Sequence, residues 1–79
     1  MDSVSWSRLR WKCRRGLLEL DLVLSRFLDR EWRRLSPGQR AAFKLLLEHS
    51  DTELWDLVCG RSQPDPGDVA AVVRLLREP

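Results

Sequence analysis

The sequence predicts an all-α fold, a compact bundle of five short helices. Apolar residues recur at helical spacing along almost the whole chain, and no segment shows the sustained apolar–polar alternation, bounded by hairpin turns, that is typical of strands. With 79 residues, of which 43% are hydrophobic and 33% charged, the chain has room for one folded unit. We therefore expect residues 1–79 to form a single helical domain, in which each short helix is held by packing against the others.

The first two helices are predicted over residues 5–14 and 17–35, with Gly16 as the corner between them. Glycine readily takes the left-handed conformation that closes many helices, so we expect Gly16 to close the first one in this way. The expected inward face of the first helix consists of Trp6, Leu9 and Cys13, and that of the second of Leu20, Leu24, Phe27, Leu28 and Leu35.

The other three helices have sequence signals at their starts. Ser36 and Gln39 form a capping box, with a proline at the first helical position, and predict a helix that ends near residue 48. Ser50 and Glu53 form a second box, for a helix that Gly60 ends. After a loop, Asp65 is predicted to cap the last helix. The inward residues expected of the last two helices are Leu54, Leu57, Val58, Val69, Val72, Val73 and Leu76.

No apolar run is long enough for a membrane span, because charged residues interrupt each of them. The first five residues lack the basic and apolar regions of a secretory leader, so the bacterial cytoplasm is the expected location. The net charge of +2 hides an asymmetry: residues 1–40 hold ten Lys or Arg against five Asp or Glu, and residues 41–79 hold four against seven. The basic half favours an acidic protein surface or a nucleic acid as partner.

Few side chains could carry chemistry. Cys13 and Cys59 form no CxxC pair and have only His49 as a further metal-binding residue type, so we expect no metal site and two small, buried apolar thiols. His49 is expected to complement the C-terminal end of the third helix. The chain has no arrangement typical of a catalytic triad and no GxGxxG or Walker-type loop. We therefore expect neither an enzyme nor a nucleotide cofactor bound in a pocket of its own.

A basic face on the first helix is the strongest candidate for a binding surface. Arg8, Trp11, Lys12 and Arg15 follow the spacing i, i+3, i+4 and i+7, which predicts that they share the face opposite the apolar stripe. Arginine and tryptophan are enriched at the centres of protein interfaces. The alternative is that Trp11 lies flat on a neighbouring helix while the basic residues only keep the surface soluble.

Glu19 also has two interpretations. It falls in the first turn of the second helix, where a carboxylate interacts favourably with the exposed N–H groups and the helix dipole. The other interpretation is a contact with a partner, reached across the corner at Gly16.

The segment Arg14 to Asp21, RRGLLELD, resembles the signature of the SdhE family, also known as succinate dehydrogenase assembly factor two, whose hallmark is RGxxE. The resemblance covers nearly the whole chain. The residues that match the motif are Arg15, Gly16 and Glu19, and the later matches are Phe27, Glu31, Trp32 at an aromatic position, Leu35, Ser36, the run 43–48, Asp51, Leu54, Trp55 and the run 73–76.

The resemblance implies a compact five-helix, chaperone-like factor for the flavoprotein subunit of succinate dehydrogenase, and often of the related fumarate reductase. We expect the free protein to be a monomer. It implies that FAD is attached covalently to a histidine of the partner and is not a cofactor of this chain. By motif match, Arg15, Gly16 and Glu19 are the expected partner-binding residues, with Trp11 and Arg14 beside them. Arg8 and Lys12 complete the candidate surface.

Two alternatives remain open at this point. A small helical nucleic-acid-binding protein would use the basic face of Arg8, Lys12 and Arg15, although a net charge of +2 is modest for a phosphate binder. Binding to DNA or RNA that falls steeply with salt would favour that function. An antitoxin-like interaction module needs only a folded helical surface, and would be recognised by co-purification with a membrane-associated or cytoskeletal protein.

Overall fold

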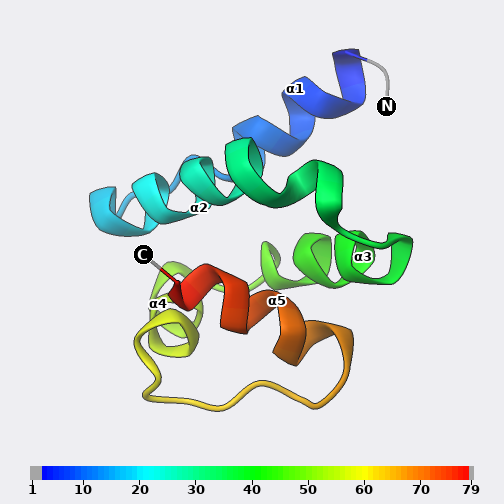
Figure 1. Ribbon diagram of the computed structural model, residues 1–79. Helices are drawn as coiled ribbons and strands as arrows, with labels where there is room; N and C mark the ends of the chain where they lie inside the picture. Colours follow the sequence, from blue (N-terminus) through cyan, green and yellow to red (C-terminus); the bar gives the residue numbers. More distant parts are fainter. Residues whose placement is uncertain (1–2, 79) are drawn as a thin grey trace.

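The computed structural model describes the backbone of residues 3–78 and the side chains of residues 6–78. Helices alone form the regular structure of this part of the chain, as the sequence predicts. In chain order they are α1 (Ser3–Lys12), α2 (Leu18–Glu31), the 3-10 helix η1 (Trp32–Arg34), α3 (Pro37–Leu46), α4 (Asp51–Cys59) and α5 (Asp68–Arg77) (Figure 1).

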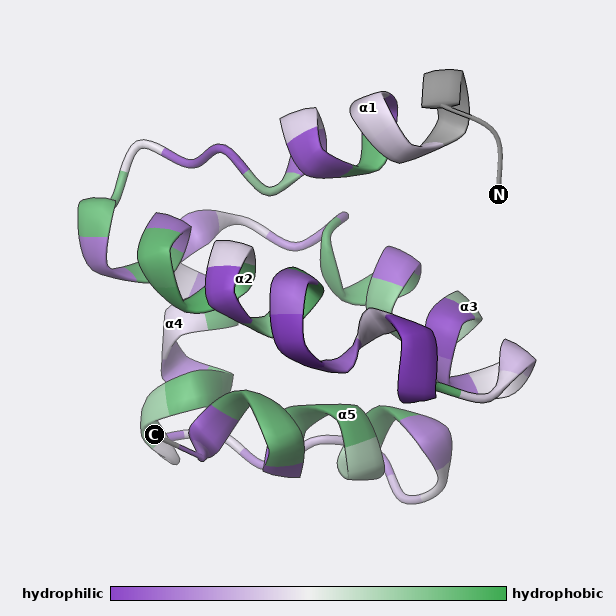
Figure 2. Cartoon of the chain, turned by 45° about the horizontal axis from the view of Figure 1, so that its top comes forward, coloured by the Kyte–Doolittle hydropathy of each residue, from purple (hydrophilic) through white to green (hydrophobic). Residues whose placement is uncertain are grey.

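Helices α1 and α2 form a hairpin that lies over the other three (Figure 1). Helix α5 packs against α2, α3 and α4 and so joins the two parts of the bundle. Coloured by hydropathy, α1 is mostly hydrophilic, whereas α5 carries a long apolar stretch (Figure 2). The inward side of α1 is nevertheless buried, because Leu9 and Cys13 are only 4% and 1% exposed.

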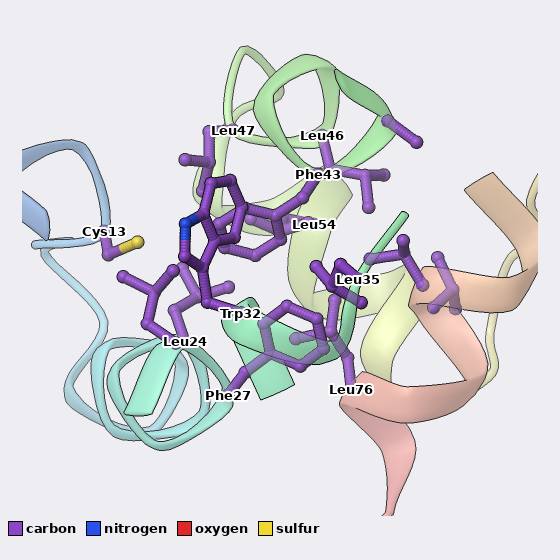
Figure 3. Close-up of a cluster of buried hydrophobic side chains, with 14 of the residues drawn as sticks. Cys13, Leu24, Phe27, Trp32, Leu35, Phe43, Leu46, Leu47, Leu54 and Leu76 are labelled. Atoms are coloured by element: carbon purple, nitrogen blue, oxygen red, sulfur yellow. The ribbon is translucent and has the colours of Figure 1, made fainter. Parts of the chain in front are cut away.

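Aromatic rings lie at the centre of the core. Phe27 of α2 stacks on Phe43 of α3, with ring centroids 4.9 Å apart, and Trp32 meets Phe43 edge-on at 5.8 Å (Figure 3). Burying each such side chain contributes roughly 1.5–3 kcal/mol to folding. The inward residues predicted for the long second helix, Leu20, Leu24, Phe27, Leu28 and Leu35, are all buried. Among the other predicted inward residues, Trp6, Val58 and Val69 are half-buried against the core and the rest are buried.

Both capping boxes are confirmed. The Gln39 N–H donates to Ser36 Oγ at 3.2 Å, and the Ser36 N–H donates to Gln39 Oε1 at 2.9 Å. The corresponding distances for Ser50 and Glu53 are 3.2 and 3.1 Å. Hydrogen bonding from Ser50 to the Glu53 carboxyl, first of all from the Ser50 backbone N–H, holds the pKa of that carboxyl below its ordinary value. Gly60 ends α4 in the left-handed conformation, with φ 85°, as predicted.

Several predicted boundaries were wrong. The helix expected to reach residue 35 ends at Glu31 and tightens into η1, and Leu35 then turns extended, with φ −74° and ψ 140°, to lead into the Ser36 cap. A 3-10 turn is a common way to end an α-helix. Helix α3 ends at Leu46, two residues before the predicted end.

The predictions for Gly16 and Asp65 were also wrong. The glycines with positive φ in residues 3–78 are Gly60 and Gly67, at 85° and 102°, so Gly16 does not take the left-handed conformation predicted for it. Asp65 does not cap α5. Gly67 occupies the N-cap position, with no side-chain cap hydrogen bond, because the loop reaches the helix two residues after Asp65.

The two cysteines lie in different surroundings. Cys13 is buried as expected, and burial raises the pKa of its thiol to about 12. Cys59 is exposed, which contradicts the prediction of a buried thiol. It is the last residue of α4, where the helix has left the core and the chain turns at Gly60.

A candidate partner-binding site at the corner between α1 and α2

Two carboxylates from elsewhere in the chain fix the backbone of the corner. The Arg15 N–H donates to Asp21 Oδ1 at 3.3 Å, and the Gly16 N–H donates to Asp51 Oδ2 at 3.2 Å. Asp21 belongs to α2, whereas Asp51 is the first residue of α4. The corner is therefore tied to two helices, and its backbone donors are satisfied within the chain.

The Arg15 side chain is turned inward and is only 14% exposed. Its Nη1 donates to the His49 carbonyl at 3.1 Å, and its Nη2 donates to the Leu47 carbonyl. Nη1 also lies 3.5 Å from Asp51 Oδ1. The last carbonyls of a helix have no partner within it, and a cation there also complements the helix dipole. Arg15 therefore closes the C-terminal end of α3 and holds it against the corner.

This position overturns the prediction that Arg15 shares a face with Arg8, Trp11 and Lys12. Helix α1 ends at Lys12, so the helical spacing does not continue to residue 15. His49 was predicted to complement the C-terminal end of α3. In the structure Arg15 takes that place through the backbone carbonyls, and the exposed His49 ring lies 3.8 Å from Glu53 Oε1.

Gly16 is exposed, and nothing within the described chain requires a glycine there. Its φ is not positive, and an added Cβ would lie 3.5 Å from Asp51 Oδ2, which is an ordinary contact. The absence of a side chain leaves the backbone open from the outside. A second molecule could therefore approach this corner more closely than if any other residue type stood at position 16.

Glu19 lies in the first turn of α2 and is exposed. Within residues 3–78 its carboxylate makes no hydrogen bond and no ion pair. Its position fits an interaction with the N-terminal end of the helix, and the free carboxylate also fits a contact with a partner. Both interpretations of Glu19 are compatible with this position.

Trp11 is 73% exposed, so the alternative in which it lies flat on a neighbouring helix is wrong. The Arg14 guanidinium carbon is 5.8 Å from the Trp11 ring centroid, and Arg14 Nε is 3.7 Å from Asp21 Oδ2. Arg8 and Lys12 are also exposed on α1. The structure thus leaves Gly16, Glu19, Trp11 and Arg14 exposed on the hairpin of α1 and α2, and it turns Arg15 inward.

Asp21 and Asp51 are residues of this site that sequence reasoning did not assign to it. Asp51 is 35 residues from Gly16, and no spacing rule connects the two positions. The start signal of α4 could show that residue 51 opens a helix, but not which part of the chain that helix faces.

The described residues contain no group of three or more His, Cys, Asp and Glu placed to hold a metal ion. Among the helices of residues 3–78, none has the length and apolar character needed to cross a membrane. The hairpin of α1 and α2 carries a bare backbone corner, a carboxylate without a partner in the described chain, an exposed tryptophan and exposed arginines. Tryptophan and arginine are enriched where proteins bind one another, so these features define a helical protein with a candidate protein-binding surface.

Comparison with known proteins gives the family. The chain belongs to the Sdh5 family, whose sequence model, described as "Flavinator of succinate dehydrogenase", matches residues 7–79. It is 44% identical to the FAD assembly factor SdhE of Legionella pneumophila (strain Lens) over 77 residues, which are 98% of this chain and 96% of that protein. It is 35% identical to the SdhE of Coxiella burnetii over 77 residues, 98% of this chain and 94% of that one. Membership confirms the expectation of an assembly factor rather than an enzyme.

Proposed function

We propose that this protein promotes the covalent attachment of FAD to the flavoprotein subunit of succinate dehydrogenase, and to that of fumarate reductase. Support comes from the family, whose relatives bear the name FAD assembly factor. The observation that carries the proposal is the division of the motif: Arg15 fixes the corner from inside, while Gly16 and Glu19 face outward.

In this proposal each motif residue has its own role. Arg15 is a positioning residue, which holds the corner through the carbonyls at the end of α3. Gly16 lets the partner's backbone come close, and Glu19 accepts charge-assisted hydrogen bonds from the partner. Together they hold the partner's FAD domain in a geometry that favours bond formation.

The chemistry of attachment belongs to the flavin and to a histidine of the partner. The factor itself is proposed to bind no FAD, to act as a monomer and to work in the bacterial cytoplasm. A nucleic-acid partner is less well supported, because a net charge of +2 is modest for a phosphate binder and the curated relatives are named FAD assembly factors.

The test measures the fraction of covalently bound flavin in the succinate dehydrogenase flavoprotein, in cells whose only copy of the factor carries Glu19→Ala. We expect that fraction to fall strongly, with the variant still folded. The matched control is Glu48→Ala, which removes an exposed carboxylate from the turn after α3. Normal flavin loading with Glu19→Ala would contradict the role proposed for Glu19. Normal loading in cells without the gene would contradict the proposed function.

A further inference from the structure

Large apolar side chains are exposed mainly on the hairpin of α1 and α2. In the described part of the chain the four exposed ones are Trp11, Leu18, Leu22 and Leu45, at 73%, 68%, 51% and 60%. The first three belong to the hairpin, and Leu45 lies apart on α3. Exposed aliphatic side chains that gather in one place mark interaction surfaces more often than isolated ones do.

We give the three hairpin residues one name, the hairpin strip: Trp11, Leu18 and Leu22. Trp11 and Leu22 line the same hollow of about 400 Å³ between α1 and α2, together with the polar side chains of Ser7, Arg10, Arg14, Asp21 and Ser25. Leu18 precedes Leu22 by one helical turn and so lies on the same face of α2. Glu19 is three residues before Leu22, which places the free carboxylate of the motif at the border of the strip.

The charges around the strip indicate what it can bind. Residues 3–12 contain three basic residues and no acidic one. Arg10 is paired with Asp29 at 2.7 Å, whereas Arg8 and Lys12 form no ion pair within residues 3–78. On the α1 side of the strip, Arg8 and Lys12 lie beside Trp11, so this side is positive and complements carboxylates on a partner.

We propose that the hairpin strip is a docking surface for an apolar segment, bordered by carboxylates, of the same flavoprotein subunit; this inference rests on the function proposed above. Leu18 and Leu22 offer aliphatic surface, which suits apolar side chains and gives no specific contact to a sugar–phosphate backbone. The strip is continuous with Glu19, so one partner can cover both. The strip supplies apolar burial, and the motif supplies orientation.

The test is isothermal titration calorimetry, in which the factor is titrated into the purified flavoprotein subunit of succinate dehydrogenase. We expect the double variant Leu18→Ser, Leu22→Ser to weaken binding about tenfold or more, since two aliphatic side chains no longer lose water at the interface. Leu45→Ser is the matched control, because it removes an equally exposed leucine from α3 and is expected to keep the original affinity. Circular dichroism melting of all variants checks that the exposed changes leave the fold intact.

A second pair of variants tests the charge of the partner. Lys12→Glu on α1 is expected to weaken binding and to reduce its salt dependence, whereas Arg74→Glu on the exposed side of α5 is expected to do neither. Equal affinity of the unmutated protein and the double leucine variant overturns the role of the hairpin strip in docking but does not contradict the proposed function. An unmutated protein that does not bind the subunit overturns both. Equal effects of Lys12→Glu and Arg74→Glu overturn the proposal that carboxylates of the partner face α1.

Discussion

The Gly16 N–H donates to Asp51 Oδ2 across 35 residues of sequence, at 3.2 Å. The second oxygen of the same carboxylate lies 3.5 Å from Arg15 Nη1. One aspartate at the start of α4 therefore holds both the backbone and the side chain of the corner. This arrangement gives Asp51 a direct influence on the outward-facing residues, although it need not touch the partner.

Replacing Asp51 by alanine is expected to lower the free energy of unfolding by about 1–2 kcal/mol, because Gly16 loses its hydrogen-bond acceptor and Arg15 loses its ion-pair partner. Asp51→Asn can still accept from the Gly16 N–H and should lose less. Urea titration measures both values. Asp56→Ala, which breaks only the ion pair with Arg61 at the other end of α4, serves as control and should change little. Equal losses for Asp51→Ala and Asp56→Ala would contradict this role.

Arg15→Ala and Glu19→Ala are expected to separate stability from function. The arginine variant leaves the carbonyls of Leu47 and His49 without their cation, so it should lose about 2 kcal/mol of stability together with flavinylation activity. The glutamate variant changes an exposed side chain without contacts in residues 3–78 and should lose activity alone. Thermal melting and covalent flavin content, measured on both variants, check the separation. A stable, inactive Arg15→Ala protein would show that Arg15 contacts the partner directly.

The two thiols are expected to react differently. In the native protein Cys59 should react with a thiol reagent within minutes, and Cys13 only on unfolding. A colorimetric thiol count before and after denaturant measures one and then two groups. Rapid labelling of both thiols without denaturant would show that α1 is not held in the way described.

The raised pKa of Cys13 also makes stability depend on alkaline pH. The thiol stays protonated in the folded state up to a pKa of about 12 but ionises near 9 when unfolded, so stability should fall as pH rises from 9 towards 12. The expected loss is about 1 kcal/mol by pH 10. Urea titrations across this range should show the loss in the unmutated protein and in Cys59→Ala, but not in Cys13→Ala. An equal slope in Cys13→Ala would contradict the assignment.

Phe27→Ala is expected to bring the protein close to unfolding. The change removes a ring that is 1% exposed and stacked on Phe43, at a cost of about 3–5 kcal/mol. That is a large share of the net stability of a domain this small. Leu22→Ala on the exposed side of the same helix should change the melting temperature little. Far-ultraviolet circular dichroism during thermal melting compares the two.

The helices and most of the core could be predicted from the sequence because they depend on local rules. The capping boxes at Ser36 and Ser50 and the left-handed Gly60 involve residues at most a few positions apart. The apolar spacing likewise identified the buried side of α2, from Leu20 to Leu28. Helical spacing on α1 also predicted the exposed side of Arg8, Trp11 and Lys12, but it wrongly added Arg15 to that side.

The geometry of the corner could not be predicted, since it depends on contacts between distant segments. Arg15 appeared to extend the basic face of α1, but its hydrogen-bond partners, the carbonyls of Leu47 and His49, lie more than 30 residues away. Asp65 has the right residue type for a cap, yet the course of the loop gives that position to Gly67. Cys59 was expected inside because free cysteines are often buried, and only the end of α4 places it outside.

The attachment of α4 to the corner has a consequence for when the protein can work. A nascent or clipped chain that lacks residues 51–59 would still contain the complete RGxxE segment, but its Gly16 and Arg15 would have lost the carboxylate that arranges them. In the proposed function, recognition therefore requires the finished tertiary structure and not the motif alone. The proposed binding surface is complete only in a chain that has folded through α4.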